Sequence, residues 1–450
     1  MRKIFILTGI FTGFMLAGIL LASRRALPAR SAESRLYIIN MLSEDISVID
    51  MRSDEVVSTI PIAGQGYNIA LSPDGTSAYV TASGDSHTQH AVNSPRLKTI
   101  DMTAQAISAQ FPLPISPLAR ISVAPDGKTA YIVTAGAAGK RNEDRGRVLF
   151  INLANGATLN TVQVGLNPLD SVMTPDGKKM YTADWASRSI SVVDLSTARL
   201  QDTIPLGVNS TRSLAMRADG KKLYTILESP PQLAAGAMVQ QNYSNVAQNL
   251  MAPTSNANIA NNAAETRQQV VAPDDNLLCE IDTTDGRIEK YPFSGINPVY
   301  AMTLSPDNTV LYAYGREPLI NYSGPQNIPA PQQSTGVRYN LYVVDLQQKQ
   351  IIKRLGNFGY LSSLVVSADG KKLYLIGTPG DAVKEANIQA RYQSSLSNTR
   401  HGPPQKDQML QDLRQVQKTV TVVDAQTGKI LKRITIGNLP QGFAVQQGAK

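Results

Sequence analysis

The sequence predicts an all-β protein, a seven-bladed β-propeller that is closed by pairing of its N- and C-terminal strands and preceded by an N-terminal hydrophobic helix. Three observations predict this fold. A turn of the type Ser-Pro-Asp-Gly recurs between apolar runs, a β-rich run ending in Asp recurs after it, and the two ends of the chain carry incomplete units. The length of 450 residues alone would suggest two or three domains, but internal repeats let one domain grow by addition.

The first element is a membrane signal. Two basic residues precede the uncharged run of residues 4–22, which is long enough to cross a bilayer as a helix. Residues 1–32 are therefore predicted to be a signal peptide or a membrane anchor. Both alternatives stay open, because the run is long for a signal peptide and residues 20–22 form only a weak cleavage site. Either one places the rest of the chain outside the cytoplasm, as a periplasmic or secreted protein that residues 4–22 tether if they are not removed.

The first repeated feature is a four-residue turn, of which Ser72-Pro-Asp-Gly75 is typical. Pro sets φ at the second position, Asp can accept hydrogen bonds from the nearby backbone, and Gly tolerates a positive φ. Apolar residues at 67–71 and 78–81 flank the turn, which is a hairpin signal. Six such turns occur, at residues 72–75, 124–127, 174–177, 217–220, 305–308 and 367–370.

The second repeated feature is a β-rich run that ends in Asp or, once, in Asn. A turn and another strand follow it, as at residues 425–428 and 429–434. Each unit therefore has four consecutive antiparallel strands, named A to D in chain order here, and this is the composition of a propeller blade. Because the Asp recurs in equivalent places, it favours a structural role in the turn over catalysis. The C strands are predicted at residues 46–50, 97–101, 148–152, 190–194, 277–282, 341–345 and 420–424.

The two ends of the chain complete one blade. Residues 36–39 look like a B strand without an A strand, and residues 442–445 look like an A strand without a B strand. Pairing them gives seven blades and covers two sheet edges that would otherwise be exposed. The propeller is predicted to span residues 33–450, with inserts at about 228–276, 315–338 and 377–418.

This repeat resembles the YVTN-type β-propeller repeat family. Tyr79-Val-Thr-Ala82, Tyr131-Ile-Val-Thr134 and Tyr181-Thr-Ala-Asp184 stand where that family has its name-giving strand, although its fourth residue, Asn, is absent. The resemblance covers residues 36–445 apart from the three inserts. It implies the propeller fold and no single function, because this repeat is used in very different proteins.

Strand direction divides the loops between two faces. Because successive strands are antiparallel, the A–B and C–D turns lie on one face, and the B–C and D–A loops lie on the other. All three inserts are B–C loops and share this insert-bearing face, whereas one blade uses little more than residues 183–188. In that short loop, Trp185, the only tryptophan, is predicted to pack inside its blade. Variable loops on a rigid scaffold usually bind ligands, so this face is predicted to hold a protein, a cell-envelope component or a small anionic ligand.

Candidate ligand-binding residues lie where the inner A strands begin, at the mouth of the central channel. Counting four and five residues back from each A–B turn gives two rings of positions that break the repeat. Arg120 and Arg212 among them could each fork onto a carboxylate or phosphate. The alternative is that these arginines pair with Asp170 and with blade ends to stabilise the ring. The positions are Tyr67, Asn68, Arg120, Asp170, Arg212, Tyr300, Ser363 and Gln441.

The composition predicts no catalytic residue, no metal site and no cofactor belonging to this chain. Cys279 is the only cysteine and falls in a predicted strand, where it is expected to be buried. His87 and His90 are two of only three histidines, and no third ligand accompanies them. The net charge of +8 falls to about +3 without the basic N-terminal segment, so nucleic-acid binding is not expected.

Two further functions stay open beside a non-enzymatic binding or scaffold protein. Quinoprotein amine dehydrogenases carry similar propellers, and their cofactors sit on partner chains, which would make this chain the propeller subunit of a redox complex. A lactonase-like hydrolase is the other alternative, because lactonase propellers use acidic and amide side chains around the central channel.

Overall fold

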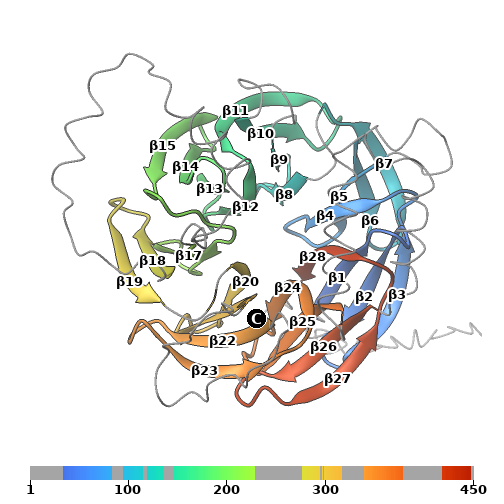
Figure 1. The fold of residues 1–450 in the computed structure, drawn as a ribbon. Helices are drawn as coiled ribbons and strands as arrows, with labels where there is room; N and C mark the ends of the chain where they lie inside the picture. The colour runs from blue at the N-terminus through green and yellow to red at the C-terminus, as the bar shows by residue number, and fades with distance from the viewer. Residues whose placement is uncertain are drawn as a thin grey trace, which may run out of the picture.

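The computed structural model describes residues 34–83, 95–114, 119–135, 145–228, 276–293, 296, 298–316, 339–378 and 418–446. These residues form 28 β-strands in seven four-stranded antiparallel sheets, which stand around a common centre as propeller blades (Figure 1). The predicted fold class and the predicted number of blades are confirmed. The predicted N-terminal helix and nearly all of the three inserts lie outside the described residues. Within the described part of the chain, no helix is long and apolar enough to cross a membrane.

Blade one joins the two ends of the described chain. Its strands, from A to D, are β28 (Pro440–Gln446), β1 (Arg35–Asn40), β2 (Asp45–Asp50) and β3 (Glu55–Pro61). The other six blades follow in chain order, each beginning with its A strand. Blade two consists of β4 (Gly66–Leu71), β5 (Ser77–Ala82), β6 (Arg96–Asp101) and β7 (Ala106–Pro112). Blade three consists of β8 (Ala119–Val123), β9 (Thr129–Thr134), β10 (Arg145–Asn152) and β11 (Thr158–Leu166).

The second half of the ring has the same construction. Blade four consists of β12 (Pro168–Met173), β13 (Lys179–Asp184), β14 (Ser189–Asp194) and β15 (Arg199–Pro205). Blade five consists of β16 (Ala215–Met216), β17 (Lys222–Leu227), β18 (Asn276–Asp282) and β19 (Ile288–Phe293). Blade six consists of β20 (Val299–Leu304), β21 (Val310–Arg316), β22 (Tyr339–Asp345) and β23 (Gln350–Gly356). Blade seven consists of β24 (Tyr360–Val366), β25 (Lys372–Thr378), β26 (Thr419–Asp424) and β27 (Ile430–Thr435).

Pairing of β28 with β1 closes the ring. Leu36 lies opposite Val445 in this antiparallel pair, and the Tyr37 hydroxyl donates a hydrogen bond to Oε1 of Gln446 at 2.9 Å. Figure 1 shows the red β28 beside the blue β1, inside the same sheet as β2 and β3. The predicted closure by the two terminal strands is confirmed.

The hydrophobic core lies between neighbouring blades. On β1, Leu36 and Ile38 pack against blade seven, whereas Tyr37 and Ile39 pack against blade two. Side chains alternate between the two faces of a strand, so a strand between two other sheets is apolar at successive positions. Cys279 is fully buried between blades four and five, as predicted, and burial raises the pKa of its thiol to about 12.

The recurrent Asp at the end of each C strand caps the turn that follows it. Oδ1 of Asp50 accepts hydrogen bonds from the N–H groups of Arg52 and Ser53 at 2.8 and 3.0 Å. The same bond is present in all six remaining blades, where a side-chain oxygen of the equivalent residue accepts a hydrogen bond from the backbone N–H two positions later in the sequence. The equivalent residues are Asp101, Asn152, Asp194, Asp282, Asp345 and Asp424. The structural role that the sequence favoured for this Asp is confirmed.

The A–B turns of successive blades interlock on the same face, which we call the turn face. At Gly177, where φ is +69°, a Cβ would lie 2.4 Å from Cδ of Pro125 in the preceding blade. Blade five has Ala218 in place of the turn Pro, and blade six has Asn308 in place of the turn Gly. The Ala218 N–H, which Pro would lack, donates to Oδ1 of Asn308 at 3.2 Å. These two departures from the repeat, in neighbouring blades, therefore compensate for each other.

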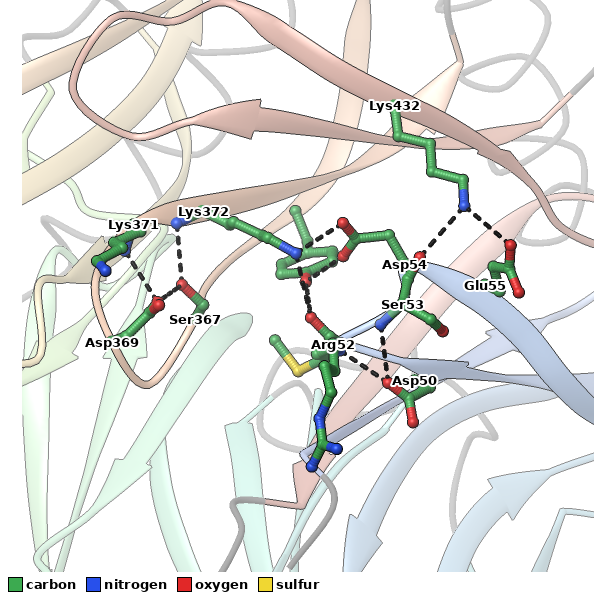
Figure 2. Close-up of polar contacts among 12 residues, drawn as sticks. Asp50, Arg52, Ser53, Asp54, Glu55, Ser367, Asp369, Lys371, Lys372 and Lys432 are labelled. Carbon is green, nitrogen blue, oxygen red and sulfur yellow. Dashed lines mark hydrogen bonds and ion pairs between the residues drawn. The ribbon is translucent and has the colours of Figure 1, made fainter. Parts of the chain in front are cut away.

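A polar seam joins blade seven to blade one on the turn face (Figure 2). Asp54, in the β2–β3 turn, accepts hydrogen bonds from Nζ of Lys372 and from the Tyr374 hydroxyl, each at 2.7 Å. Asp54 is 8% exposed and Tyr374 is fully buried. Lys432 and Glu55 form a second pair nearby, at 3.4 Å and in contact with solvent. Side chains therefore reinforce the closure that the strand pairing makes.

Candidate functional site

The predicted site residues lie around the centre of the ring on the insert-bearing face. All of them except Ser363, which lies in the middle of β24, stand near the beginning of an A strand or just before it, after a D–A loop. Tyr67 and Asn68 belong to β4, Arg120 to β8, Asp170 to β12, Tyr300 to β20, Ser363 to β24 and Gln441 to β28, and Arg212 precedes β16. His87, His90 and His401 lie outside the described residues.

Tyr67 and Asn68 lie where blades one, two and three meet. Oδ1 of Asn68 accepts a hydrogen bond from the Ile121 N–H of β8 at 3.4 Å. On the other side of β4, a Cβ on Gly442 of β28 would lie 2.7 Å from the Tyr67 carbonyl oxygen, so these two backbones touch. Both positions therefore hold neighbouring A strands together.

Arg120 reaches from blade three to blade four. Its Nε donates to the Leu169 carbonyl at 2.8 Å and lies 3.2 Å from Oδ1 of Asp170. Oδ2 of Asp170 accepts the Leu214 N–H at 2.9 Å, which extends the contact into blade five. The pairing of an arginine with Asp170, which the sequence offered as the alternative to ligand binding, is present for Arg120. The Arg120 side chain nevertheless stays 48% exposed.

Arg212 pairs with Glu228 and not with Asp170, and because Glu228 directly follows β17, this is the pairing with a blade end that the alternative also named. Its Nε donates to Oε2 of Glu228 at 3.0 Å, and its guanidinium carbon lies 4.9 Å above the Trp185 ring. The reason is position, because Glu228 ends the neighbouring B strand directly opposite the D–A loop that carries Arg212. Trp185 is only partly buried beneath Arg212, so the predicted packing inside its blade is replaced by a stacking role.

Glu228 is a residue of this candidate site that the sequence analysis missed. Its Oε1 accepts the Val299 N–H at 3.1 Å, which ties blade five to blade six. Burial raises the pKa of this carboxyl, while Arg212, the Val299 N–H and the Trp185 indole work against that rise. A charged residue directly after the apolar strand β17 is the signal that could have identified it.

Tyr300 belongs to an aromatic cluster at the junction of blades six and seven. Its ring centroid lies 5.9 Å from that of Tyr339, and Tyr339 lies 6.0 Å from Tyr314. The Tyr314 hydroxyl donates to the Gly359 carbonyl and accepts the Leu361 N–H at 3.3 Å. Ser363 lies buried in β24 of blade seven, and Gln441 lies in β28 of blade one.

The contacts form a continuous polar arc across blades two to six. Each step is a hydrogen bond from one blade to the next, and the side chains that make them are all different, unlike those of the turn face. Both arginines use Nε for these contacts, and within the described residues their Nη atoms have no recorded partner. We call Asn68, Arg120, Asp170, Arg212, Glu228 and Tyr300 the mouth arc. Its chemistry suits recognition of an anion.

The chain is similar to two curated proteins over parts of their length, and no family model matches it. The seven-bladed beta-propeller protein Rv1057 of Mycobacterium tuberculosis is 32% identical over 166 residues, which cover 37% of this chain and 36% of that protein. Antigen Lp49 of Leptospira interrogans is 32% identical over 65 residues, 14% of each chain. The matches therefore span only about a third and a seventh of these relatives.

Solved structures share the fold at low sequence identity. A protein from Bacteroides uniformis, provisionally assigned as a 6-phosphogluconolactonase, has a TM-score of 0.52 and 11% identity, covering 92% of this chain and 100% of that one. Hydrazine synthase of Kuenenia stuttgartiensis has a TM-score of 0.47 and 15% identity, covering 82% and 95%. The first likeness shows the propeller fold alone, and the second carries no argument. The seven-bladed propeller is thus supported by the fold and by the mycobacterial relative.

Proposed function

We propose that this chain is a non-catalytic binding or scaffold propeller of the YVTN repeat type. Its N-terminal segment places it outside the cytoplasm, periplasmic or secreted, and residues 4–22 anchor it to the membrane if they are not cleaved. Its insert-bearing face holds a protein, a cell-envelope component or a small anionic ligand.

One observation carries the proposal, namely the difference between the two faces. The turn face uses the same short turns and the same capping Asp or Asn in blade after blade. The opposite face carries the mouth arc, whose residues do not repeat, and the strand ends between which the three long inserts of the sequence are connected. Non-repeated side chains on a rigid repeated scaffold are what a specific binding surface requires.

Capture of partners by the full chain tests the proposal. The chain carries a C-terminal tag, and bound envelope components are identified by mass spectrometry. A variant lacking residues 229–272 and 379–417 is expected to lose the specific set. A matched control, Asp219→Asn on the turn face, should keep it. The same bound set with and without the two inserts would overturn the proposal.

The same preparation separates the alternatives. Co-purification of subunits that carry heme or a quinone cofactor would replace this proposal with the redox-complex subunit. Calcium-dependent hydrolysis of lactones by the purified chain would replace it with the lactonase-like hydrolase. Partner capture without either result supports a binding or scaffold role.

A further inference from the structure

We propose that Arg120 and Arg212 bind one small oxoanion, a carboxylate or phosphate group, at the centre of the insert-bearing face. This inference rests on the proposed function, because it names the ligand class for a face that is proposed to bind. It concerns a free small molecule, and an acidic side chain of a partner protein is treated below as the competing outcome.

Arg120 is held in place by contacts that leave most of its binding capacity unused. Nε makes both of its contacts, to the Leu169 carbonyl at 2.8 Å and to Asp170 at 3.2 Å. A guanidinium is planar, so fixing Nε also fixes the direction of the two Nη groups. With the side chain 48% exposed, these donors are open to a ligand from the insert-bearing face.

Arg212 is held in the same manner by different partners. Nε donates to Glu228 at 3.0 Å, and the guanidinium lies 4.9 Å above the Trp185 ring. Stacking on an aromatic ring restrains the plane of a guanidinium without using its N–H donors. The side chain is 31% exposed, so its Nη groups also stay accessible.

Both arginines contact the same edge of blade four, because Arg120 bonds Leu169 and Asp170 near the start of β12, and Arg212 stacks on Trp185, which directly follows the β13 strand that pairs with β12. One oxygen of Asp170 lies 3.2 Å from Nε of Arg120, and the other accepts the N–H of Leu214, two residues after Arg212. Asp170 and Glu228 balance both positive charges, so net charge does not supply the attraction. The attraction comes from two oriented forks, and a carboxylate or phosphate presents oxygens spaced to accept paired N–H bonds from such a fork.

The only tryptophan of the chain provides the measurement. Trp185 lies directly beneath Arg212, so its fluorescence reports on an anion that binds there. We expect a saturable change when the purified full chain is titrated with inorganic phosphate or citrate at constant ionic strength, and none with potassium chloride. Arg120→Gln leaves the indole surroundings intact and should weaken binding by about tenfold to a hundredfold, the usual effect of losing a charged hydrogen bond.

Asp170→Asn should raise the affinity for the anion, whereas Arg120→Gln should lower it. Asn keeps an oxygen for the Leu214 N–H but removes the negative charge beside Arg120, so anion affinity should rise by about threefold or more. If the arginines served only to close the ring, this variant would lower the melting temperature without changing anion affinity. Arg217→Gln is the matched control, because Arg217 pairs with Asp219 at 2.9 Å on the turn face and should bind no ligand.

The outcomes separate this inference from the proposed function. Wild-type affinity in Arg120→Gln, or an equal loss in Arg217→Gln, overturns the oxoanion site whatever proteins are captured. If Arg120→Gln does not fold, Arg120→Lys is the replacement variant, because lysine keeps the charge but lacks the paired N–H donors of the guanidinium. Its affinity for the anion should be about tenfold lower than that of the wild type. Loss of a captured protein in Arg120→Gln, with no response to free anions, overturns the small-molecule assignment in favour of a partner's carboxylate. Anion binding without captured proteins supports the oxoanion site and contradicts only the proposed role as a scaffold for proteins.

Discussion

Carboxyl groups on the two faces of the ring have pKa values shifted in opposite directions. On the turn face, hydrogen bonds from neighbouring turn residues lower the pKa of exposed carboxyls, as at Asp176 and Asp194. On the insert-bearing face, burial raises the pKa of Asp45, Asp184 and Glu228. Local bonds within one turn are sufficient for the first group, whereas the second group bonds residues of other strands and, at Glu228, of the next blade. The comparison indicates that the turn face maintains the repeat and that the other face carries what is specific to this protein.

Blade four shows the contrast within a single sheet. Asp184 ends β13 on the insert-bearing face, is fully buried, and accepts hydrogen bonds from Thr182 and Ser191 at 2.8 and 2.5 Å. Asp194 ends β14 on the turn face and accepts two backbone N–H groups from exposed positions. The same residue type is thus part of a buried network at one end and a solvated cap at the other.

The largest expected effect is at the seam between blades seven and one, where the turn face itself contains a buried carboxylate. Asp54→Asn keeps the side-chain shape and the left-handed backbone, at φ 57°, that Asn tolerates. It removes the charge that Lys372 and buried Tyr374 contact, so unfolding should become easier by about 2 kcal/mol. The measurement is urea denaturation followed by circular dichroism.

The adjacent pair in Figure 2 is the control for this seam. Glu55 is paired with Lys432 in solvent, so Glu55→Gln should change the free energy of unfolding by no more than about 0.5 kcal/mol. Equal effects of Asp54→Asn and Glu55→Gln would show that burial does not distinguish the two pairs and would contradict the account of the closure.

The sequence predicted the fold well because its signals are local and repeated. The Pro-Asp-Gly turns, the capping Asp and the incomplete end units specify strand number, order and closure without knowledge of how blades pack. Counting back from the turns also located Arg120 at the beginning of β8 and Arg212 shortly before β16. Asp170 was predicted as a partner of these arginines, but Glu228 was not, because the angle between blades decides which carboxylate each arginine meets. The stacking of Trp185 depends on the same angle.

A second, smaller effect separates the two faces by pH. The lowered pKa of Asp194 contributes stability above the unfolded value of about 4, and this stability is lost as the pH falls through the folded pKa. The raised pKa of Asp184 acts in reverse, because ionising the buried carboxyl costs stability as the pH rises above about 4. As the pH falls from neutral to about 4, the protein should gain stability from protonation of Asp184, and Asp184→Asn should reduce this gain. As the pH falls further, the protein should lose the stability that ionised Asp194 contributes, and Asp194→Asn should reduce this loss.

Urea midpoints at a series of pH values measure both slopes. The gain in Asp184→Asn should shrink without vanishing, because Glu228 and Asp45 shift in the same direction. A wild-type pH profile in Asp184→Asn above about pH 4 would remove the electrostatic distinction between the faces.

The smallest effect concerns the irregular step between blades five and six in the interlocked turns. Ala218→Pro removes the N–H that Asn308 accepts, and Asn308→Gly removes the acceptor, so each change alone breaks the bond at 3.2 Å. Both changes together restore the Pro–Gly contact found at Pro125 and Gly177. The double variant should therefore be more stable than the sum of the single effects by about 0.5 kcal/mol, a modest figure because Ala218 is exposed.

Denaturation of all four proteins in a double-mutant cycle measures this coupling. The pair Ala368→Pro and Asn308→Gly is the uncoupled reference, because these two residues share no hydrogen bond in the described residues. A coupling of zero for the first pair would mean that the two departures arose independently, and the turn face would then be a set of separate turns instead of a linked ring.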